Sequence, residues 1–165
     1  ALSILRNPPP SFAGRKVGVL VTDGVDAGLL AALRAAVEEQ QAVLKVVAPM
    51  VGGVEASDGS WVEADEKIDG GPSVLFDAVA LLPSAEGAAL LGRESTARDF
   101  VADAFAHLKV IGYAEAALPL LQKAGVPDDA DEGLVPLGTA GDVAGFLAAC
   151  AKLRVWSREP EVKVV

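Results

Sequence analysis

Histidine and cysteine, the side chains that most often carry catalysis or bind transition metals, occur only once each in this sequence, as His107 and Cys150. A single cysteine excludes a disulfide within the chain, and its free thiol favours a reducing environment such as the cytoplasm. One histidine and one cysteine also fall short of the ligand set of a zinc site. We therefore expect no disulfide, no metal centre and a cytoplasmic location.

Basic residues are also scarce, because 14 lysines and arginines stand against 23 aspartates and glutamates, giving a formal net charge of −9. An acidic surface repels nucleic acid phosphates and anionic lipids, so neither nucleic acid nor a membrane is an expected partner. No apolar run approaches the roughly 20 residues that cross a bilayer. The prolines at 8–10 come too early for a signal peptide, and we expect none.

The apolar residues that are present, 52% of 165, are enough to build the core of one domain. Short apolar runs alternate with segments of helical periodicity, which indicates strands that alternate with helices. The predicted buried strands are 16–24, 43–49, 76–83 and 109–114, with a short edge strand at 134–138. The predicted helices are 25–42, 95–109, 115–125 and a last one capped by Thr139. We predict an α/β fold with a three-layer, doubly wound, mainly parallel sheet.

The remaining segments set the expected domain limits. Residues 1–15 contain three consecutive prolines and are predicted to be a linker that follows another domain. The domain itself is predicted to span 16–157, with a tail at 158–165. Between the second and third strands, Asp58 and Gly59 indicate a hairpin.

In such sheets ligands bind beyond the carboxyl ends of the strands. Three loops are therefore candidates: "TDGVD" at 22–26, "PSAEG" at 83–87 and "YAEA" at 113–116. The third is a strand-to-helix bend of the kind that carries a nucleophile in many α/β enzymes, yet it offers neither serine nor cysteine. Glu115 stands there instead. A helix start favours the ionised carboxylate, which makes Glu115 a poor general acid, and we interpret it as structural. The alternative is an acid–base pair with Asp26.

The other reactive side chains are interpreted as structural. Cys150 lies on the apolar face of the last helix, which predicts a buried thiol. His107 ends the helix before the fourth strand, at the opposite edge of the sheet, and Asp103 lies one helical turn before it as a surface partner. Tyr113 ends a buried strand and is expected to pack there rather than to ligate a haem.

A phosphate site is not expected in the first loop either. Asp23 and Asp26 would repel a phosphate, and the loop lacks the glycine patterns of nucleotide-binding sites.

The three loops, in this order, resemble those of the DJ-1/PfpI superfamily, which is related to class I glutamine amidotransferases. The resemblance places Asp26 at the family's acidic position. It places Ser84 and Ala85 where the family has a glycine pair that forms an oxyanion hole. It also places Glu115 at the cysteine position and Ala116 at the histidine position. The resemblance implies a flavodoxin-like fold with a degenerate site and no catalytic residues.

A second resemblance extends over nearly the whole chain, in "RNPPPSFAGRKVGVLVTDGVD", "SDGSWVEADEKIDGGPSVLFDAVALLPS" and "KVIGYAEAALPLLQKAGV". These stretches resemble the C-terminal flavodoxin-like domain of large-subunit (clade 2) haem catalases. In that family the domain follows a haem-bearing core through a linker. The resemblance implies that the haem belongs to the core, that this domain binds no cofactor, and that the parent enzyme detoxifies hydrogen peroxide.

The expected role is therefore that of a non-enzymatic accessory domain, which supports stability and assembly. The resemblance implies the preceding catalase core and sister subunits as partners, and unfolded client proteins as a further one in a chaperone-like role. Tyr113 is preceded at the relevant spacing by Lys109 rather than the arginine of a haem-ligating tyrosine. Peroxide dismutation by this chain alone is thus not expected. Two alternatives stay open: a divergent enzyme that uses Asp26 and Glu115, and a module that binds a small molecule.

Overall fold

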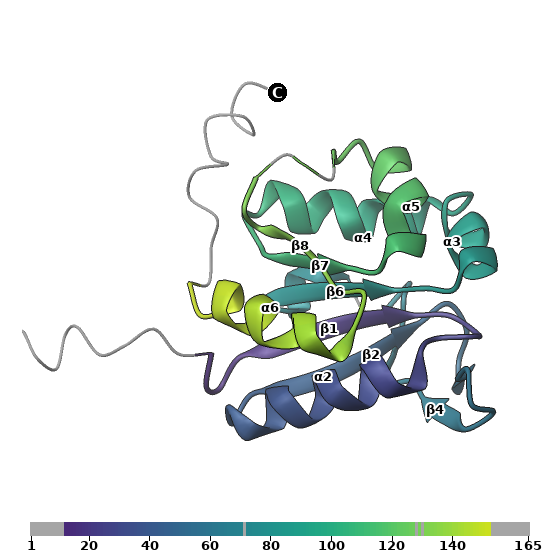
Figure 1. Cartoon of the computed structure of the whole chain (residues 1–165). Helices are drawn as coiled ribbons and strands as arrows, with labels where there is room; N and C mark the ends of the chain where they lie inside the picture. Colours follow the sequence, from purple (N-terminus) through teal and green to yellow (C-terminus); the bar gives the residue numbers. More distant parts are fainter. Residues whose placement is uncertain (1–11, 71, 128, 130, 153–165) are drawn as a thin grey trace, which may run out of the picture.

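The computed structural model describes residues 12–70, 72–127, 129 and 131–152 (Figure 1). Its main sheet has six parallel strands in the order β5-β2-β1-β6-β7-β8. These are β5 (Glu66–Lys67), β2 (Val43–Ala48), β1 (Lys16–Val21), β6 (Ala78–Leu82), β7 (Ile111–Tyr113) and β8 (Leu134–Pro136). The chain passes from β1 to β2 on one side and later to β6 on the other, which confirms the predicted doubly wound, parallel sheet.

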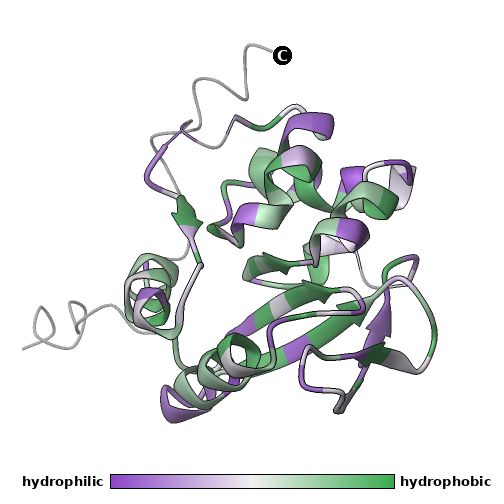
Figure 2. Cartoon of the chain, turned by 45° about the vertical axis from the view of Figure 1, so that its right-hand side comes forward, coloured by the Kyte–Doolittle hydropathy of each residue, from purple (hydrophilic) through white to green (hydrophobic). Residues whose placement is uncertain are grey.

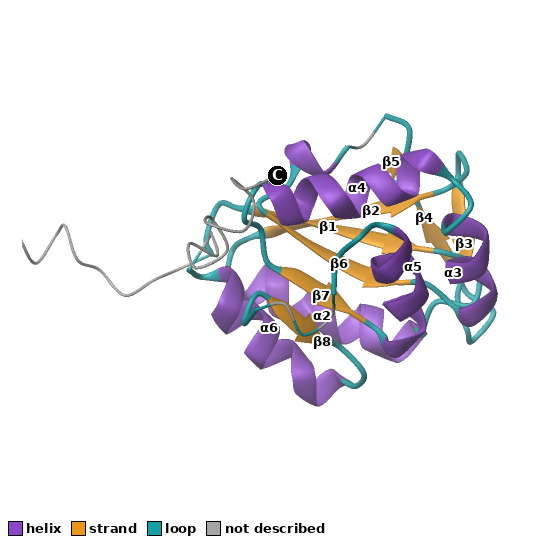
Figure 3. Cartoon of the chain, turned by 90° about the horizontal axis from the view of Figure 1, so that it is seen from above, coloured by secondary structure: helices purple, strands orange, loops and turns teal. Residues whose placement is uncertain are grey.

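Helices cover both faces of this sheet and make three layers (Figures 1 and 3). One face is covered by α2 (Ala27–Glu39) and α6 (Val143–Cys150), whose apolar side chains share one core cluster with the sheet. The other face is covered by α3 (Ala85–Leu91), α4 (Ser95–Ala106) and α5 (Leu118–Lys123), which share a second cluster with it. The helix α3 and the strand β5 were not predicted from the sequence.

The central strands are apolar throughout because they are buried on both sides. In β1, Val17, Val19 and Val21 belong to the cluster under α2 and α6, whereas Leu20 belongs to the cluster on the opposite face. In Figure 2 the hydrophobic colour concentrates on the sheet and on the inner sides of the helices. The predicted run of valines is therefore a core strand of an α/β sheet.

Two helices end earlier than their periodicity predicted. The apolar pattern extends to 109 for α4, yet that helix ends at Ala106 because Leu108 adopts a left-handed φ of 66°. Lys109 N–H then donates to the carbonyl of Ala104 at 3.0 Å, which closes the end of the helix. The end of α2 is similar, with Gln41 at a φ of 61°. A β-carbon tolerates this backbone poorly, so the sequence carries little sign of either stop.

Two predicted helix ends are confirmed. Gly125 follows α5 with a φ of 77°, a backbone that glycine adopts freely. Thr139 precedes the short 3₁₀ helix η3 (Ala140–Asp142), which leads into α6. The carboxylate of Asp142 accepts from the N–H of Thr139 at 3.0 Å and from that of Gly138 at 2.8 Å. These hydrogen bonds hold the pKa of Asp142 below its usual value.

A two-stranded antiparallel hairpin, β3 (Gly53–Glu55) and β4 (Trp61–Glu63), lies outside the main sheet. The predicted turn at Asp58 and Gly59 joins its strands. Two further 3₁₀ helices, η1 (Ser73–Leu75) and η2 (Glu115–Ala117), precede β6 and α5.

The packed domain begins earlier than the predicted boundary at residue 16. Phe12 has no exposed surface and belongs to the core cluster under α2 and α6, so residues 12–15 are part of the domain rather than of a linker. The remainder of the predicted linker, 1–11, and the predicted tail, 158–165, lie outside the described residues.

We predict that Gly112→Ala lowers the free energy of unfolding by about 1–3 kcal/mol because it overpacks the core. Gly112 lies on β7 directly under α6. A β-carbon there would lie 2.5 Å from Leu137 and 2.7 Å from the ring of Phe146. Urea unfolding of both variants and the wild type measures the effect.

Gly145→Ala is the matched control, since a β-carbon at this position of α6 meets no atom within 4 Å. Alanine at a helical glycine stabilises by roughly 0.5–1 kcal/mol. Equal effects of the two substitutions would contradict the packing described for Gly112.

Candidate functional site

The three candidate loops leave the sheet side by side at its carboxyl edge. They follow β1, β6 and β7, which are adjacent in the sheet. The first two flank the point where the strand order reverses, between β1 and β6, which is where sheets of this type bind ligands. What the loops can do depends on whether their polar groups are free for a ligand or already engaged.

The aspartates of the first loop both hold backbone N–H groups. Asp26 is the N-cap of α2, and its Oδ1 accepts from Leu29 N–H at 3.0 Å. Asp23 Oδ1 accepts from Glu55 N–H at 2.9 Å, and Gly24 N–H donates to the carbonyl of Glu55 at 2.8 Å. The loop is thereby fixed to α2 on one side and to the β3–β4 hairpin on the other.

The second loop is bound to the end of β1. Ser84 N–H donates to Thr22 Oγ1 at 2.9 Å, and the two hydroxyl oxygens lie 3.3 Å apart. Ser84 Oγ accepts from Gly87 N–H at 3.0 Å and caps α3, whose first residue is Ala85. A β-carbon at Gly87 would overlap the side chain of Thr22. We call Thr22, Ser84 and Gly87 the switch-point junction, because they join the two strands that flank the reversal.

The third loop turns without presenting a nucleophile. Ala114 N–H donates to the carbonyl of Leu81 at 2.9 Å, which ties the bend to β6. Glu115 and Ala116 then form the start of η2, and Pro119 lies in the first turn of α5. The Glu115 side chain is exposed and has no hydrogen bond or ion pair within the part of the chain that the structure describes.

The hollow at the switch point is lined by neither of the two candidate carboxylates. Asp26 begins α2 on one face of the sheet, whereas Glu115 leads into α5 on the other. The hollow has a volume of about 310 Å³. Its lining includes Thr22 and Ser84, but neither Asp26 nor Glu115.

The remaining candidates lie where their patterns predicted. Cys150 is fully buried, and desolvation raises the pKa of its thiol above the usual value. Tyr113 is 8% exposed and packs in the cluster under α4 and α5. His107 is the C-cap residue of α4, and its Nδ1 lies 2.8 Å from the backbone carbonyl oxygen of Asp103. Asp103 is therefore its partner as expected, but through the backbone carbonyl and not through the carboxylate.

The described part of the chain holds neither clustered metal ligands nor a membrane-spanning helix. Residues 12–70, 72–127, 129 and 131–152 contain no group of three or more histidine, cysteine, aspartate or glutamate side chains placed to hold a metal ion. Within the same ranges no helix is both long and apolar enough to cross a bilayer.

Sequence reasoning missed two members of the junction, Thr22 and Gly87. Thr22 is the one polar residue at the end of the β1 run, and it is 4% exposed. Its polarity within an apolar run was the available signal. No signal in the sequence indicated that position 87 requires glycine, because the requirement arises from a contact between residues 65 positions apart.

Comparison with known proteins identifies a matching family and related proteins. A family model described as the C-terminal domain found in long catalases matches residues 13–160. Catalase C of Rhizobium meliloti is 57% identical over 99% of the chain, and catalase HPII of Pseudomonas aeruginosa is 32% identical over all of it. The chain spans 23% of the length of each of these two relatives.

Among solved structures, Drosophila melanogaster DJ-1beta has a similar fold, with a TM-score of 0.71 over 92% of this chain and 97% of its own. Only 17% of the aligned residues are identical, so this likeness concerns the fold alone.

We predict that Ser84→Ala destabilises the chain by about 1 kcal/mol, since it removes the N-cap of α3. Thr22→Val leaves Ser84 N–H without its acceptor and is expected to cost about 1–3 kcal/mol. The two effects should be less than additive because the residues share one hydrogen-bonded junction. Urea unfolding of the single and double variants measures this coupling.

Ser95→Ala is the control, because Ser95 is exposed on α4 and forms no side-chain hydrogen bond within the described residues. Its effect should stay within about 0.5 kcal/mol. Strict additivity of the Thr22 and Ser84 substitutions would show that the junction is not a cooperative unit.

Proposed function

The chain belongs to the family of C-terminal domains found in long catalases, and from this premise we propose that it is an accessory domain without a reaction of its own. In this proposal it supports the stability and assembly of a parent catalase. The parent detoxifies hydrogen peroxide with a haem held in the core that precedes this domain. Its partners are that core and the sister subunits, and its location is the cytoplasm.

The observation that carries the proposal is the structural use of the polar groups at the carboxyl edge. Asp23, Asp26 and Ser84 each accept a hydrogen bond from a backbone N–H. A catalytic acid, base or nucleophile instead needs a free face toward a bound substrate. Glu115, the candidate residue of the third loop, is exposed and does not line the switch-point hollow. These contacts support a scaffold in which the inherited site serves folding.

A chaperone-like contribution is a second component of the proposal, and exposed apolar side chains favour it. Near the carboxyl edge, Met50 is 70% exposed, Val51 84%, Trp61 60% and Leu90 60%. Met50 lines two hollows that both include Asp23 of the first loop, and it shares one with Trp61 and the other with Leu90. Apolar surface of this kind is what binding to unfolded chains requires. Methionine suits such binding because its side chain adapts to varied partners.

We predict that deleting the domain from Phe12 onward leaves peroxide turnover per haem at 25 °C unchanged while thermal inactivation accelerates by about tenfold, since kinetic stability depends on contacts outside the chemistry. Activity is followed after timed heating, and subunit assembly by analytical ultracentrifugation. The chaperone component predicts in addition that the truncated enzyme suppresses the light scattering of a heated client protein less than the full-length enzyme does.

The full-length enzyme is the reference. If the truncated enzyme kept the same inactivation rate and the same assembly, the accessory role would be wrong. A loss of turnover at 25 °C in a fully assembled, haem-loaded truncated enzyme would instead indicate participation in the chemistry.

A further inference from the structure

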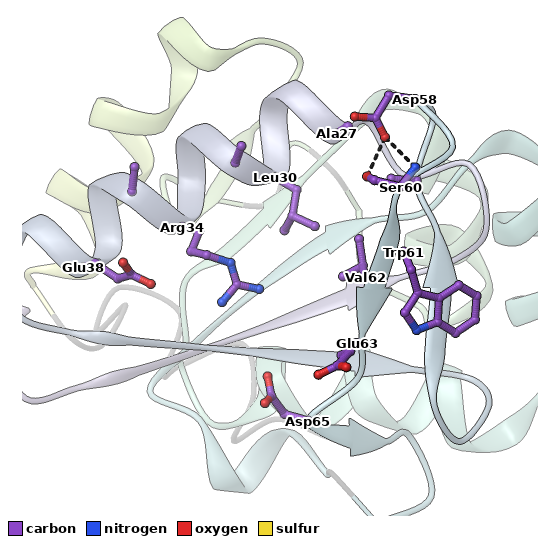
Figure 4. A pocket seen from close by; sticks show the side chains of 13 residues that line it. Ala27, Leu30, Arg34, Glu38, Asp58, Ser60, Trp61, Val62, Glu63 and Asp65 are labelled. Atoms are coloured by element: carbon purple, nitrogen blue, oxygen red, sulfur yellow. Dashed lines mark hydrogen bonds between the residues drawn. The ribbon is translucent and has the colours of Figure 1, made fainter.

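A groove of about 640 Å³ runs between α2 and β4 (Figure 4). On the helix side it is lined by Leu30, Arg34 and Glu38, together with alanines. On the strand side it is lined by Trp61, Val62 and Glu63. No residue of β3 contributes to this lining, so the groove follows the edge of β4 that faces away from β3.

That outer edge of β4 is unpaired. Ala56 N–H donates to the carbonyl of Ser60 at 2.8 Å, and Ala64 N–H to that of Gly52 at 3.2 Å. In an antiparallel pair these bonds alternate along the strand, so Val62 turns its backbone groups toward β3. Trp61 and Glu63 then turn theirs outward. Within the described residues no backbone group pairs with them there.

The opposite edge of the hairpin is already occupied. β3 turns Glu55 outward, and both backbone groups of Glu55 are bound by the first loop: its N–H by Asp23 and its carbonyl by Gly24. The hairpin therefore has one closed edge and one open edge. An open strand edge beside a groove is the feature that accepts an added strand.

The chemistry of the groove favours a basic occupant. Carboxylates line it at Glu38, Asp58, Glu63 and Asp65, against the single cation Arg34. Figure 4 shows Arg34 reaching into the groove from α2, and Glu63 and Asp65 from the opposite side. Arg34 lies within salt-bridge distance of no carboxylate in the part of the chain that the structure describes.

The floor of the groove is apolar. Leu30 is 5% exposed and Val62 is partly buried against the core under α2 and α6. An extended segment that alternates basic and apolar side chains would match both features, because successive residues of a strand point to opposite sides.

We propose that this groove docks an extended basic segment of the catalase core, which adds as a strand to the outer edge of β4. This inference rests on the proposed function. The relatives extend well beyond this domain, since it spans 23% of their length, and a tethered core is present at high effective concentration. A second copy of this chain fits less well, because its net charge of −9 opposes the acidic groove.

The test places a photo-reactive side chain at position 31 in the full-length enzyme, because Ala31 is exposed and lines the groove. Mass spectrometry then identifies the cross-linked peptide. We expect a lysine- or arginine-containing peptide from the core. The control is position 89, where Ala89 is exposed on α3 and lies on the opposite face of the sheet. Position 89 should give no such product.

Charge reversal supplies the second arm. Glu38→Lys with Glu63→Lys should reduce the yield of the cross-link by about tenfold, because it replaces attraction by like-charge repulsion. Glu39→Lys, next to Glu38 on α2 but outside the groove lining, should leave the yield unchanged. Amide hydrogen exchange at Trp61 and Glu63 should accelerate only in the double variant.

The proposal is overturned if position 31 links only to the same domain of another subunit, to no segment at all, or to the same peptides as position 89. These outcomes are distinguishable from failure of the proposed function. If deletion of the domain accelerates inactivation but position 31 links nothing, the accessory role stands and only this docking site is wrong.

Discussion

The hydrogen bond from Ser84 N–H to Thr22 Oγ1 joins the two loops that flank the switch point, and the rest of the carboxyl edge depends on it. It positions Ser84 to cap α3, and it sets Thr22 against Gly87 so closely that no β-carbon fits between them. With the end of β1 fixed, Asp23 and Gly24 can bind Glu55 and close one edge of the hairpin. At this crevice, where sheets of this type usually bind a ligand, hydrogen bonds within the chain itself fix the loops.

This use of the edge is consistent with the accessory role proposed for a sheet that has the architecture of an enzyme. Short polar side chains that follow a buried strand can either bind a substrate or satisfy the N–H groups at the start of the next helix. In this chain Asp26 and Ser84 do the second. The surfaces proposed for partners are instead the open edge of β4 and the apolar side chains near Met50. The hairpin that carries β4 is itself anchored by the first loop.

The three layers and the parallel, doubly wound sheet followed from the sequence because they rest on local patterns. The valine runs and the 3.6-residue periodicity are visible in any window of the chain, and Gly125 marks its helix end directly. The end of α4 was not predictable, because Leu108 takes a left-handed backbone that its residue type disfavours. β5 was missed because its two residues are held by pairing with β2, and not by a pattern of their own.

The candidate site was predictable in its location and only partly in its contents. The three loops could be assigned to one edge because each follows a strand of a sheet that was predicted to be parallel. The partners of Asp23 and Ser84, in contrast, come from segments 32 and 62 residues away, and only the folded chain brings them together. Phe12 shows the same limit, because its burial under α2 and α6 could not be inferred from a proline-rich neighbourhood.

The most direct test of this account asks whether Asp26 acts as a helix cap or as an acid, by measuring thermal inactivation and peroxide turnover of the full-length enzyme with Asp26→Asn and with Asp26→Ala. Asparagine caps a helix about as well as aspartate but carries no charge. The account predicts wild-type behaviour for Asp26→Asn, and faster inactivation with unchanged turnover at 25 °C for Asp26→Ala. Turnover that falls equally in both variants, without faster inactivation, would show that the carboxylate takes part in chemistry and would contradict the account.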